Sequence, residues 1–523
     1  MSLRSDRITG ALVKHPFVIS AVLVLAVLAA TGMQINNNIL VCSIMVPGYI
    51  LVAGYGLYLK KARKLSDEAL TAIIFALGFI LRLGYVLYTS IEIRQNDIGV
   101  FQEGNYNIFH SGYILFMRDR FSIPDFDVRI GGQFYHPPFH YFVSAVFLKI
   151  YELFLPAGTH NYEALQALSL LWSQYSLIMI FKVLKLLGIR EEDHVTSAYI
   201  ISAFPVFTLL SGSINNDVLS ILLFFTGFYF GLKWFKDGSW KDIIFSALAI
   251  GFGMMTKLSV GIIAFPLGFL FIVRFIKDLK DKSGKKTGAR SFLQLVVFAV
   301  ICAPLGLWYE IRNYLKFGVP LGYVLRSTNT YQDISRFTPF QRLFGFYGFP
   351  IEDYYINLGS DGEQDYNIFI TMVKTALFGE ENYRDDLTMS MAGYVLLIVF
   401  LVMIAIALAG FVTMLVRLKK RGHIFEDLSM AVLVVAEAVS VITFSFKYPH
   451  ICSMNFRYST PLILCGTVFY LNSGSIKIPG ISEELTSKLT KVTGMAFFVL
   501  SILFYTILWT YVKGDVQVVD PVW

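Results

Sequence analysis

The chain has 523 residues, of which 55% are hydrophobic, 16% aromatic and 15% charged, with a formal net charge of +7. Soluble domains carry about 25% charged residues, and single soluble cores stop growing at about 250–300 residues. The composition therefore predicts an all-α polytopic membrane protein, and it excludes a disordered chain and nucleic acid as a partner. The four cysteines lack paired spacing, so neither a disulfide framework nor a metal site is predicted from them.

The first half of the topology follows from apolar runs and basic loops. Apolar runs near 16–33 and 40–59 are followed at once by the basic loop 60–64. A span needs about 20 apolar residues, and short basic loops stay in the cytoplasm. The N-terminus is therefore predicted to be cytoplasmic, with an uncleaved first span. A third run near 69–90 then delivers the polar loop 91–137 to the external face.

Downstream basic loops give the same orientation. The block around Lys257 has cytoplasmic flanks on both sides, so it is predicted to be a short hairpin with Lys257 near its outer apex. The apolar piece 138–155 is predicted to be a re-entrant or surface helix, because a crossing there would invert every later loop. About 13 spans result, with the tail from Gly514 outside. The other predicted spans are 164–187, 195–212, 217–235, 291–309, 389–416, 429–446, 458–472 and 492–512.

Acidic residues follow the third predicted span. Asp97 lies at its external mouth, with Glu103 further along and Asp125 and Asp127 later in the same loop. A partly buried carboxylate there can act as a general base towards a substrate hydroxyl. The alternative is an ordinary solvated loop aspartate. The Asp125-x-Asp127 pair could also hold a divalent cation, although such pairs are common in loops.

Further polar residues fall on the same predicted face. His136 and His140 flank a proline pair that starts a helix, and hydrogen bonding or packing explains them better than metal binding, because no third ligand is suitably spaced. Asn216 and Asp217 are either capping residues of an outer turn or groups that line a site.

Three cations, Lys257, Arg312 and Arg457, are also predicted on the external face. Each alone is explained as an interfacial anchor. Together they run against the positive-inside bias, and Arg and Lys are the side chains that bind phosphate. A general base opposite several cations suits nucleophilic attack on a group that carries a phosphate as its leaving group, because the cations neutralise the negative charge that develops.

These motifs, in this order, resemble bacterial members of the GT-C glycosyltransferase superfamily, specifically those similar to protein O-mannosyltransferases and the lipid A aminoarabinose transferase. The likeness spans roughly residues 70–470. The motifs that carry it are Arg94–Gly99, Tyr135–His140, Asn215–Asp217, Met254–Leu258, Trp308–Tyr314 and Arg457–Pro461.

The resemblance implies a GT-C-like bundle in the cell membrane that transfers a sugar from a polyprenyl-monophosphate donor to a glycan, lipid or protein acceptor at the extracytoplasmic face. Asp97 would be the catalytic base of an inverting reaction. Relatives often carry two adjacent acids, whereas Ile98 follows Asp97 here, so a second acid would be Glu103, Asp125 or Asp127. No cofactor is certain, and a divalent cation stays an open alternative.

The domain organisation expected from the resemblance has four parts. Residues 1–68 form two accessory transmembrane helices, and 69–315 form the catalytic core. Residues 316–388 form an external aromatic-rich segment, and 389–523 form the C-terminal helices and external tail. Two other functions remain open. One is a lipid-linked oligosaccharide polymerase or ligase, which would use a diphosphate donor. The other is a transporter or flippase of lipid-linked sugars, which would show repeated halves that this sequence lacks.

Overall fold

A computed structural model describes residues 14–93, 99–281, 287–326, 330–346, 355–357, 364–383, 386–418, 422–475 and 483–511. Regular secondary structure in these residues is helical, apart from an isolated bridge between Asp333 and His450. The helices are α2 (Pro16–Thr31), α3 (Asn38–Lys61), α4 (Asp67–Tyr88), α5 (Phe109–Arg120), α6 (Phe139–Glu152), α7 (Leu165–Leu186), α8 (His194–Ser202), α9 (Pro205–Leu210), α10 (Asp217–Asp237), α11 (Trp240–Met254), α12 (Ala264–Lys280), α13 (Thr287–Phe317), α14 (Pro339–Phe344), α15 (Ile368–Phe378), α16 (Leu387–Arg417), α17 (Ile424–Lys447), α18 (Pro461–Asn472) and α19 (Glu483–Tyr511).

Nine helices in the described residues are long and apolar enough to cross a membrane, which confirms an all-helical multi-pass membrane protein. The other predicted spans correspond to shorter elements. These are α2 with 16 residues, the pair α8 and α9, α11 with 15 residues and α18 with 12. The α6 helix has 14 residues, which is short of the roughly 20 that a span needs.

The predicted span 195–212 differs from the structure because it contains a proline. The helix α8 ends at Ser202, and α9 starts at Pro205. The residue before a proline avoids the helical region, and Phe204 accordingly has an extended backbone with φ −63° and ψ 122°. The chain therefore contains two short helices where the apolar pattern predicted one.

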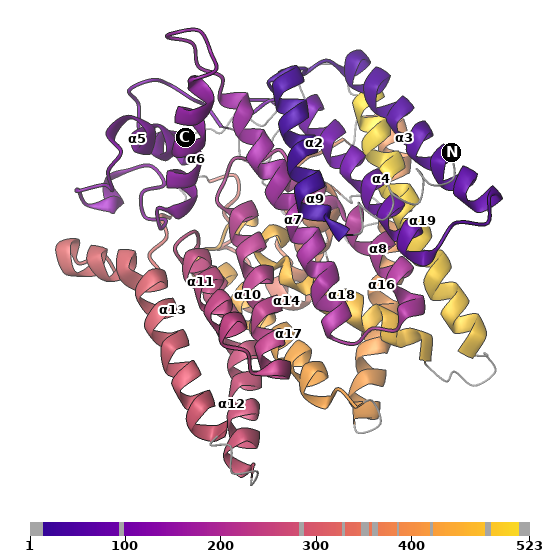
Figure 1. The fold of residues 1–523 in the computed structure, drawn as a ribbon. Helices are drawn as coiled ribbons and strands as arrows, with labels where there is room; N and C mark the ends of the chain where they lie inside the picture. Colours follow the sequence, from indigo (N-terminus) through magenta and orange to yellow (C-terminus); the bar gives the residue numbers. More distant parts are fainter. Residues whose placement is uncertain are drawn as a thin grey trace.

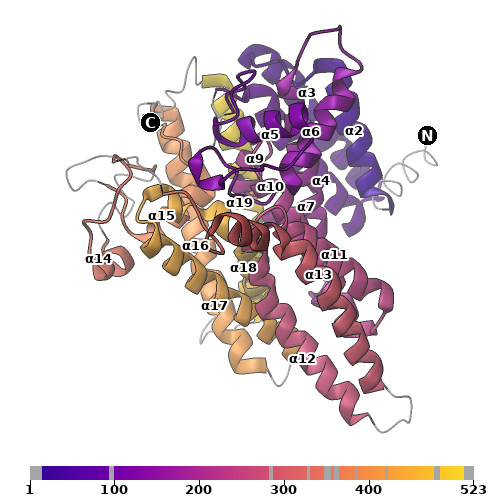
Figure 2. The same ribbon diagram turned by 90° about the vertical axis from the view of Figure 1, so that its left-hand side faces the viewer.

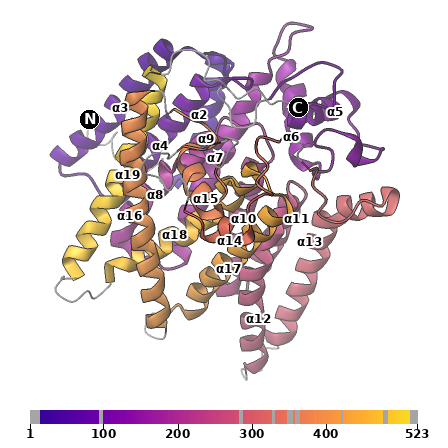
Figure 3. The ribbon, with the colours of Figure 1, turned by 180° about the vertical axis from the view of Figure 1, so that it is seen from behind.

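The helices form one bundle, and different elements cover its two ends. Figure 1 shows α5 and α6 at the upper end, while the hairpin of α12 and α13 projects at the opposite end. In Figure 2, α14 and α15 lie on the side away from α2. The α16 helix packs against α18 and α19, as the view from behind shows (Figure 3).

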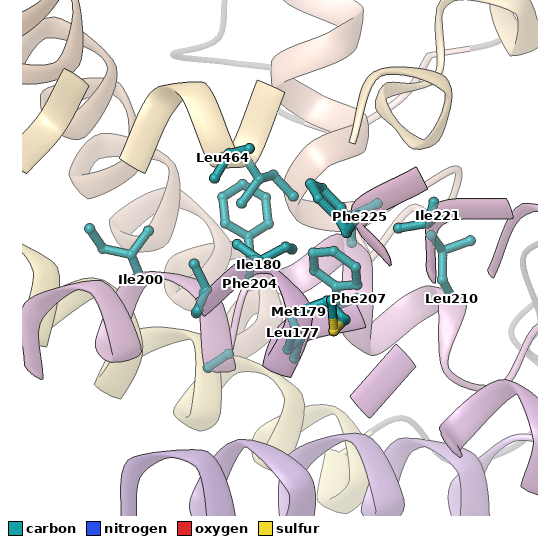
Figure 4. Packing of buried hydrophobic residues seen from close by; sticks show 14 of the residues in the cluster. Leu177, Met179, Ile180, Ile200, Phe204, Phe207, Leu210, Ile221, Phe225 and Leu464 are labelled. Atoms are coloured by element: carbon teal, nitrogen blue, oxygen red, sulfur yellow. The ribbon is translucent and has the colours of Figure 1, made fainter. Parts of the chain in front are cut away.

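The largest apolar core extends through most of the bundle, and α7, α8, α9, α10 and α18 meet within it. Ile180 of α7, Phe204 at the break and Phe225 of α10 are buried there, and Figure 4 shows them with their neighbours. The α10 helix also packs against α11, and α11 packs against α13. This packing holds the start of α10 and the turn after α11 next to each other, and both carry predicted site residues.

Candidate active site

Three ionisable side chains from distant parts of the chain meet in the interior. Asp217 is the first residue of α10, Lys257 follows α11, and Arg457 lies in the short helix η7 (Phe456–Ser459). The Lys257 ammonium group forms an ion pair with Asp217 Oδ1. Arg457 Nε lies 3.7 Å from Asp217 Oδ2. One carboxylate is thus shared by two cations.

All three side chains are largely withdrawn from solvent. Side-chain exposure is 16% for Lys257, 7% for Arg457 and 6% for Asp217. Removing two cations from water around one carboxylate is unfavourable unless a further anion balances them. The arrangement therefore favours an anionic ligand.

Local structure fixes these residues. The Asn215 side chain accepts a hydrogen bond from the Asp217 backbone N–H at 3.1 Å, and Asn216 donates to the Thr256 carbonyl at 3.1 Å. The N-terminus of α10 also favours a carboxylate at Asp217, because the helix dipole is positive there. The Asn-Asn-Asp turn is therefore tied to the turn that carries Lys257.

The aromatic ring of Tyr458 lies close to both cations. Lys257 Nζ lies 4.5 Å from the centre of this ring, and the Arg457 guanidinium carbon lies 5.0 Å from it. Arg457 also donates a hydrogen bond to the Tyr458 hydroxyl at 3.0 Å. The ring face supports both positive charges through cation–π attraction.

A small cavity of about 40 Å³ opens between these groups. Space of this size holds a few water molecules. Its polar lining also includes Glu437 of α17, which is 2% exposed, and hydroxyl groups of Ser220, Ser440 and Thr460. Our sequence analysis missed Glu437 and Tyr458. An acidic residue within the apolar run 429–446 is the signal that could have identified Glu437.

Asp97 lies outside the described residues, but both ends of its loop are described. The Gly99 N–H donates to the Ile91 carbonyl at 2.6 Å, and the Ile91 N–H donates to the Glu163 carboxylate at 3.0 Å. A Cβ atom at Gly99 would collide with the Ile214 side chain. Ile214 stands three residues before Asp217 in the chain, so the ends of the loop lie beside the turn that leads to Asp217.

The predicted histidines lie next to this turn. His140 Nε2 lies 2.9 Å from the Ile214 carbonyl oxygen and donates to it. The His136 ring stacks on His110, with ring centres 5.7 Å apart, and His110 Nδ1 lies 2.8 Å from the Tyr141 hydroxyl. Our sequence analysis did not identify His110 or Tyr141, because only folding brings α5 against α6.

Burial and neighbouring charges keep these imidazoles neutral. Burial lowers the pKa of His140 to about 3, with a further contribution from His110 and opposing effects of the Ile214 carbonyl and Asp217. Burial, His110 and Lys257 hold the pKa of His136 well below its ordinary value. Both histidines are therefore neutral near pH 7, and His140 donates its hydrogen bond to the Ile214 carbonyl in that form.

This pKa shift predicts a loss of stability in acid. The unfolded His140 side chain takes up a proton below about pH 6.5, whereas the folded one does so only near pH 3. The contribution of His140 to stability is therefore constant above about pH 6.5 and falls below it, by at most about 1.4 kcal/mol per pH unit. We expect the melting temperature to drop between pH 7.5 and 5.5, and to drop less in His140→Gln. Substitution of the exposed His15 by Gln is the control; an equal drop in all three proteins would contradict the assignment.

The remaining predicted residues lie in other clusters. Arg312 donates to the Pro124 carbonyl at 2.6 Å and to Asp125 at 3.2 Å, and Lys316 pairs with the same carboxylate. Lys316 and Arg312 hold the pKa of Asp125 below its ordinary value. The structure thus places Arg312 with the loop around Asp125, and none of its described polar contacts involves Lys257 or Arg457.

Asp127 and Glu103 also have basic partners. Asp127 pairs with Arg129 at 2.6 Å, and hydrogen bonds from Arg129 lower the pKa of this aspartate. Glu103 pairs with Arg118 at 2.6 Å. In the part of the chain that the structure describes, no group of three or more His, Cys, Asp or Glu side chains is arranged to hold a metal ion.

One family model matches part of the chain. Residues 135–308, about a third of the chain, match the family model of dolichyl-phosphate-mannose-protein mannosyltransferase. This segment contains His136, His140, Asp217 and Lys257. The match confirms the predicted resemblance, and at that level it confirms the prediction of a membrane glycosyltransferase that uses lipid-phosphate-linked sugars.

No curated protein matches the chain. Among solved structures, the crystal structure of ArnT from Cupriavidus metallidurans in the apo state matches over 84% of this chain and 75% of that chain, with 12% sequence identity and a TM-score of 0.42.

Proposed function

We propose that this protein transfers one sugar from a polyprenyl-monophosphate donor to an acceptor hydroxyl, with Lys257 and Arg457 binding the donor phosphate. The observation that carries the proposal is the meeting of these two cations at one small cavity, where both pair with the carboxylate of Asp217 and Glu437 also lines the wall. The family match over residues 135–308 supports the donor class.

The proposed reaction displaces the lipid phosphate from the anomeric carbon of the sugar. The acceptor hydroxyl attacks the anomeric carbon from the side opposite the phosphate, and its proton moves to Asp97. The bond between the anomeric carbon and the phosphate oxygen breaks, and the electron pair leaves with the phosphate. The lipid phosphate thus gains one negative charge, which Lys257 and Arg457 stabilise. In-line displacement inverts the configuration of the sugar.

Asp217 has a separate role in this proposal. It orients Lys257 and Arg457, and it partly neutralises them when no donor is bound. The ends of the Asp97 loop pack beside Ile214, which supports placing the base near this cluster. We leave Arg312 out of the proposed phosphate site because its contacts are with the Asp125 loop.

The proposed site faces away from the cytoplasm within a GT-C-like bundle. The basic residues Arg274, Lys277 and Lys280 near the end of α12, and Arg417 at the end of α16, favour a cytoplasmic location for that end of the bundle. The external segment 316–388 would then contribute to acceptor recognition, since loops commonly carry specificity.

The type of donor tests this proposal directly. The purified protein should bind undecaprenyl phosphate more tightly than undecaprenyl diphosphate, and mass spectrometry should find one glycan, lipid or glycoprotein of the envelope that loses a sugar when the gene is deleted. Tighter binding of the diphosphate would favour a polymerase or ligase. Movement of a lipid-linked sugar across vesicles without a new glycosidic bond would favour a flippase. Either result would overturn the proposal.

A further inference from the structure

The stretch from Ser202 to Ile214 lies within the buried core and contains a break between two helices. It runs from the last residue of α8 through α9 to the turn before α10, and Figure 4 shows Phe204, Phe207 and Leu210 packed among apolar neighbours. Such interruptions leave backbone carbonyl groups without intrahelical partners. Away from water these groups must be satisfied by other parts of the protein.

A polar face of α7 supplies most of the partners. Gln166 donates to the Gly212 carbonyl at 3.3 Å, Ser169 to the Ser213 carbonyl, and Ser173 to the Phe207 carbonyl at 3.0 Å. These three residues are spaced by three and four positions, so they lie on one side of the helix. We call Gln166, Ser169 and Ser173 the α7 polar face.

Arg82 of α4 holds the other end of the interrupted stretch. Its guanidinium group donates to the Ser202 carbonyl and to the Gln174 side-chain oxygen, and the residue is fully buried. Gly78 lies one turn earlier on α4, and a Cβ atom there would collide with the same carbonyl. The close approach of α4 therefore requires glycine at this position.

Arg82 is unusual for a cation at this depth. Within the described part of the chain, no carboxylate lies within ion-pair distance of it. Charged residues within membrane spans are costly and generally serve function. A neutral donor would satisfy one carbonyl group at a lower desolvation cost than a buried guanidinium group. We therefore attribute the arginine to its ability to donate two hydrogen bonds of fixed geometry at once.

The interrupted stretch leads directly into the site. His140 holds the Ile214 carbonyl, and the next three residues are Asn215, Asn216 and Asp217. Any shift of this stretch would therefore move the carboxylate that pairs with Lys257.

We infer that Arg82 and the α7 polar face are positioning residues that fix the interrupted helix, so that Asp217 holds Lys257 and Arg457 in a phosphate-binding arrangement. This inference rests on the proposed function. It goes beyond it by assigning a role to residues that do not line the cavity.

A matched pair of double variants tests the inference. Ser169→Ala/Ser173→Ala removes two hydroxyls that bond the interrupted stretch. The control Ser176→Ala/Thr467→Ala removes two buried hydroxyls that bond only within their own helices, to the carbonyls of Trp172 and Ile463. The readout is the affinity of the purified, folded protein for undecaprenyl phosphate. We expect the affinity to fall by about 10-fold or more in the first variant, because a displaced Asp217 no longer orients the two cations that would bond the phosphate, and by less than about 2-fold in the control.

Coupling to Asp217 separates positioning from general stability. In an Asp217→Ala background, the loss caused by Ser169→Ala/Ser173→Ala should largely disappear, because the carboxylate that these residues position is gone. Arg82→Lys, which retains the charge but not the two-pronged geometry, should show the same coupled loss. An unchanged affinity in the serine variant, or a loss that persists in the Asp217→Ala background, would overturn the inference. Failure of the unmodified protein to bind undecaprenyl phosphate would instead overturn the proposed function.

Discussion

Substitution of Asp97 by Asn should lower the rate of sugar transfer by about 10²–10⁴-fold, which is the usual effect of removing a positioned general base. The amide preserves the size of the side chain but cannot accept the acceptor's proton. The expected effect is on kcat, with little change in affinity for the donor phosphate, because the phosphate is assigned to Lys257 and Arg457. The measurement is the release of polyprenyl phosphate from the native donor, per mole of folded protein.

The matched control for Asp97 is Glu92→Gln. Glu92 is an exposed acid at the start of the same loop, so this variant changes the loop charge equally while leaving the assigned base in place. Its transfer rate should stay within about twofold, as is usual for an exposed surface substitution. Full activity in Asp97→Asn, with normal membrane insertion, would remove Asp97 from the mechanism.

Loss of either cation of the cavity should weaken donor binding strongly. Lys257→Met and Arg457→Met each remove a charged donor while retaining an unbranched apolar chain. Hydrogen bonds to charged groups contribute about 1.5–3 kcal/mol, so each variant should raise the dissociation constant for undecaprenyl phosphate by roughly 10- to 150-fold. The variants should not behave independently, because both cations contact Asp217.

Lys316→Met provides the comparison for the cation variants. Lys316 also pairs with an aspartate, Asp125, but its side chain is 50% exposed and lies with the Asp125 loop. This variant should bind the lipid phosphate normally. Equal weakening in all three variants would mean that the general positive charge of the protein, rather than the buried pair, attracts the lipid.

The sequence singled out most of the side chains that meet at the candidate site, but it did not predict which of them lie together. Lys257, Arg457 and Asp217 were candidates because basic and acidic residues are costly near spans, and the structure brings them together. Arg312 met the same criterion, yet it contacts Asp125. Nothing in the order of residues distinguishes these cases, because the direction in which a side chain points depends on how its helix packs.

The histidine cluster was also predicted only in part from the sequence. His136 and His140 were candidates through their own motif, whereas His110 lies in a different helix and was not singled out. Its stacking on His136 depends on the packing of α5 against α6. Glu437 is a buried acid within an apolar run. A search for apolar runs does not detect it, since one acid barely changes the mean hydropathy of a long run.

Apolar runs and basic loops were sufficient to establish a helical, multi-pass membrane protein, because the bilayer imposes a length and a charge asymmetry that can be read locally along the chain. They could not reveal that the run 195–212 breaks at Pro205, or which side chains satisfy the carbonyl groups released there. Those partners come from α4, α6 and α7, and only the folded bundle brings them together. The cavity between Asp217, Lys257 and Arg457 likewise exists only in the tertiary structure, because its walls come from elements that are distant in sequence and meet only in the packed bundle.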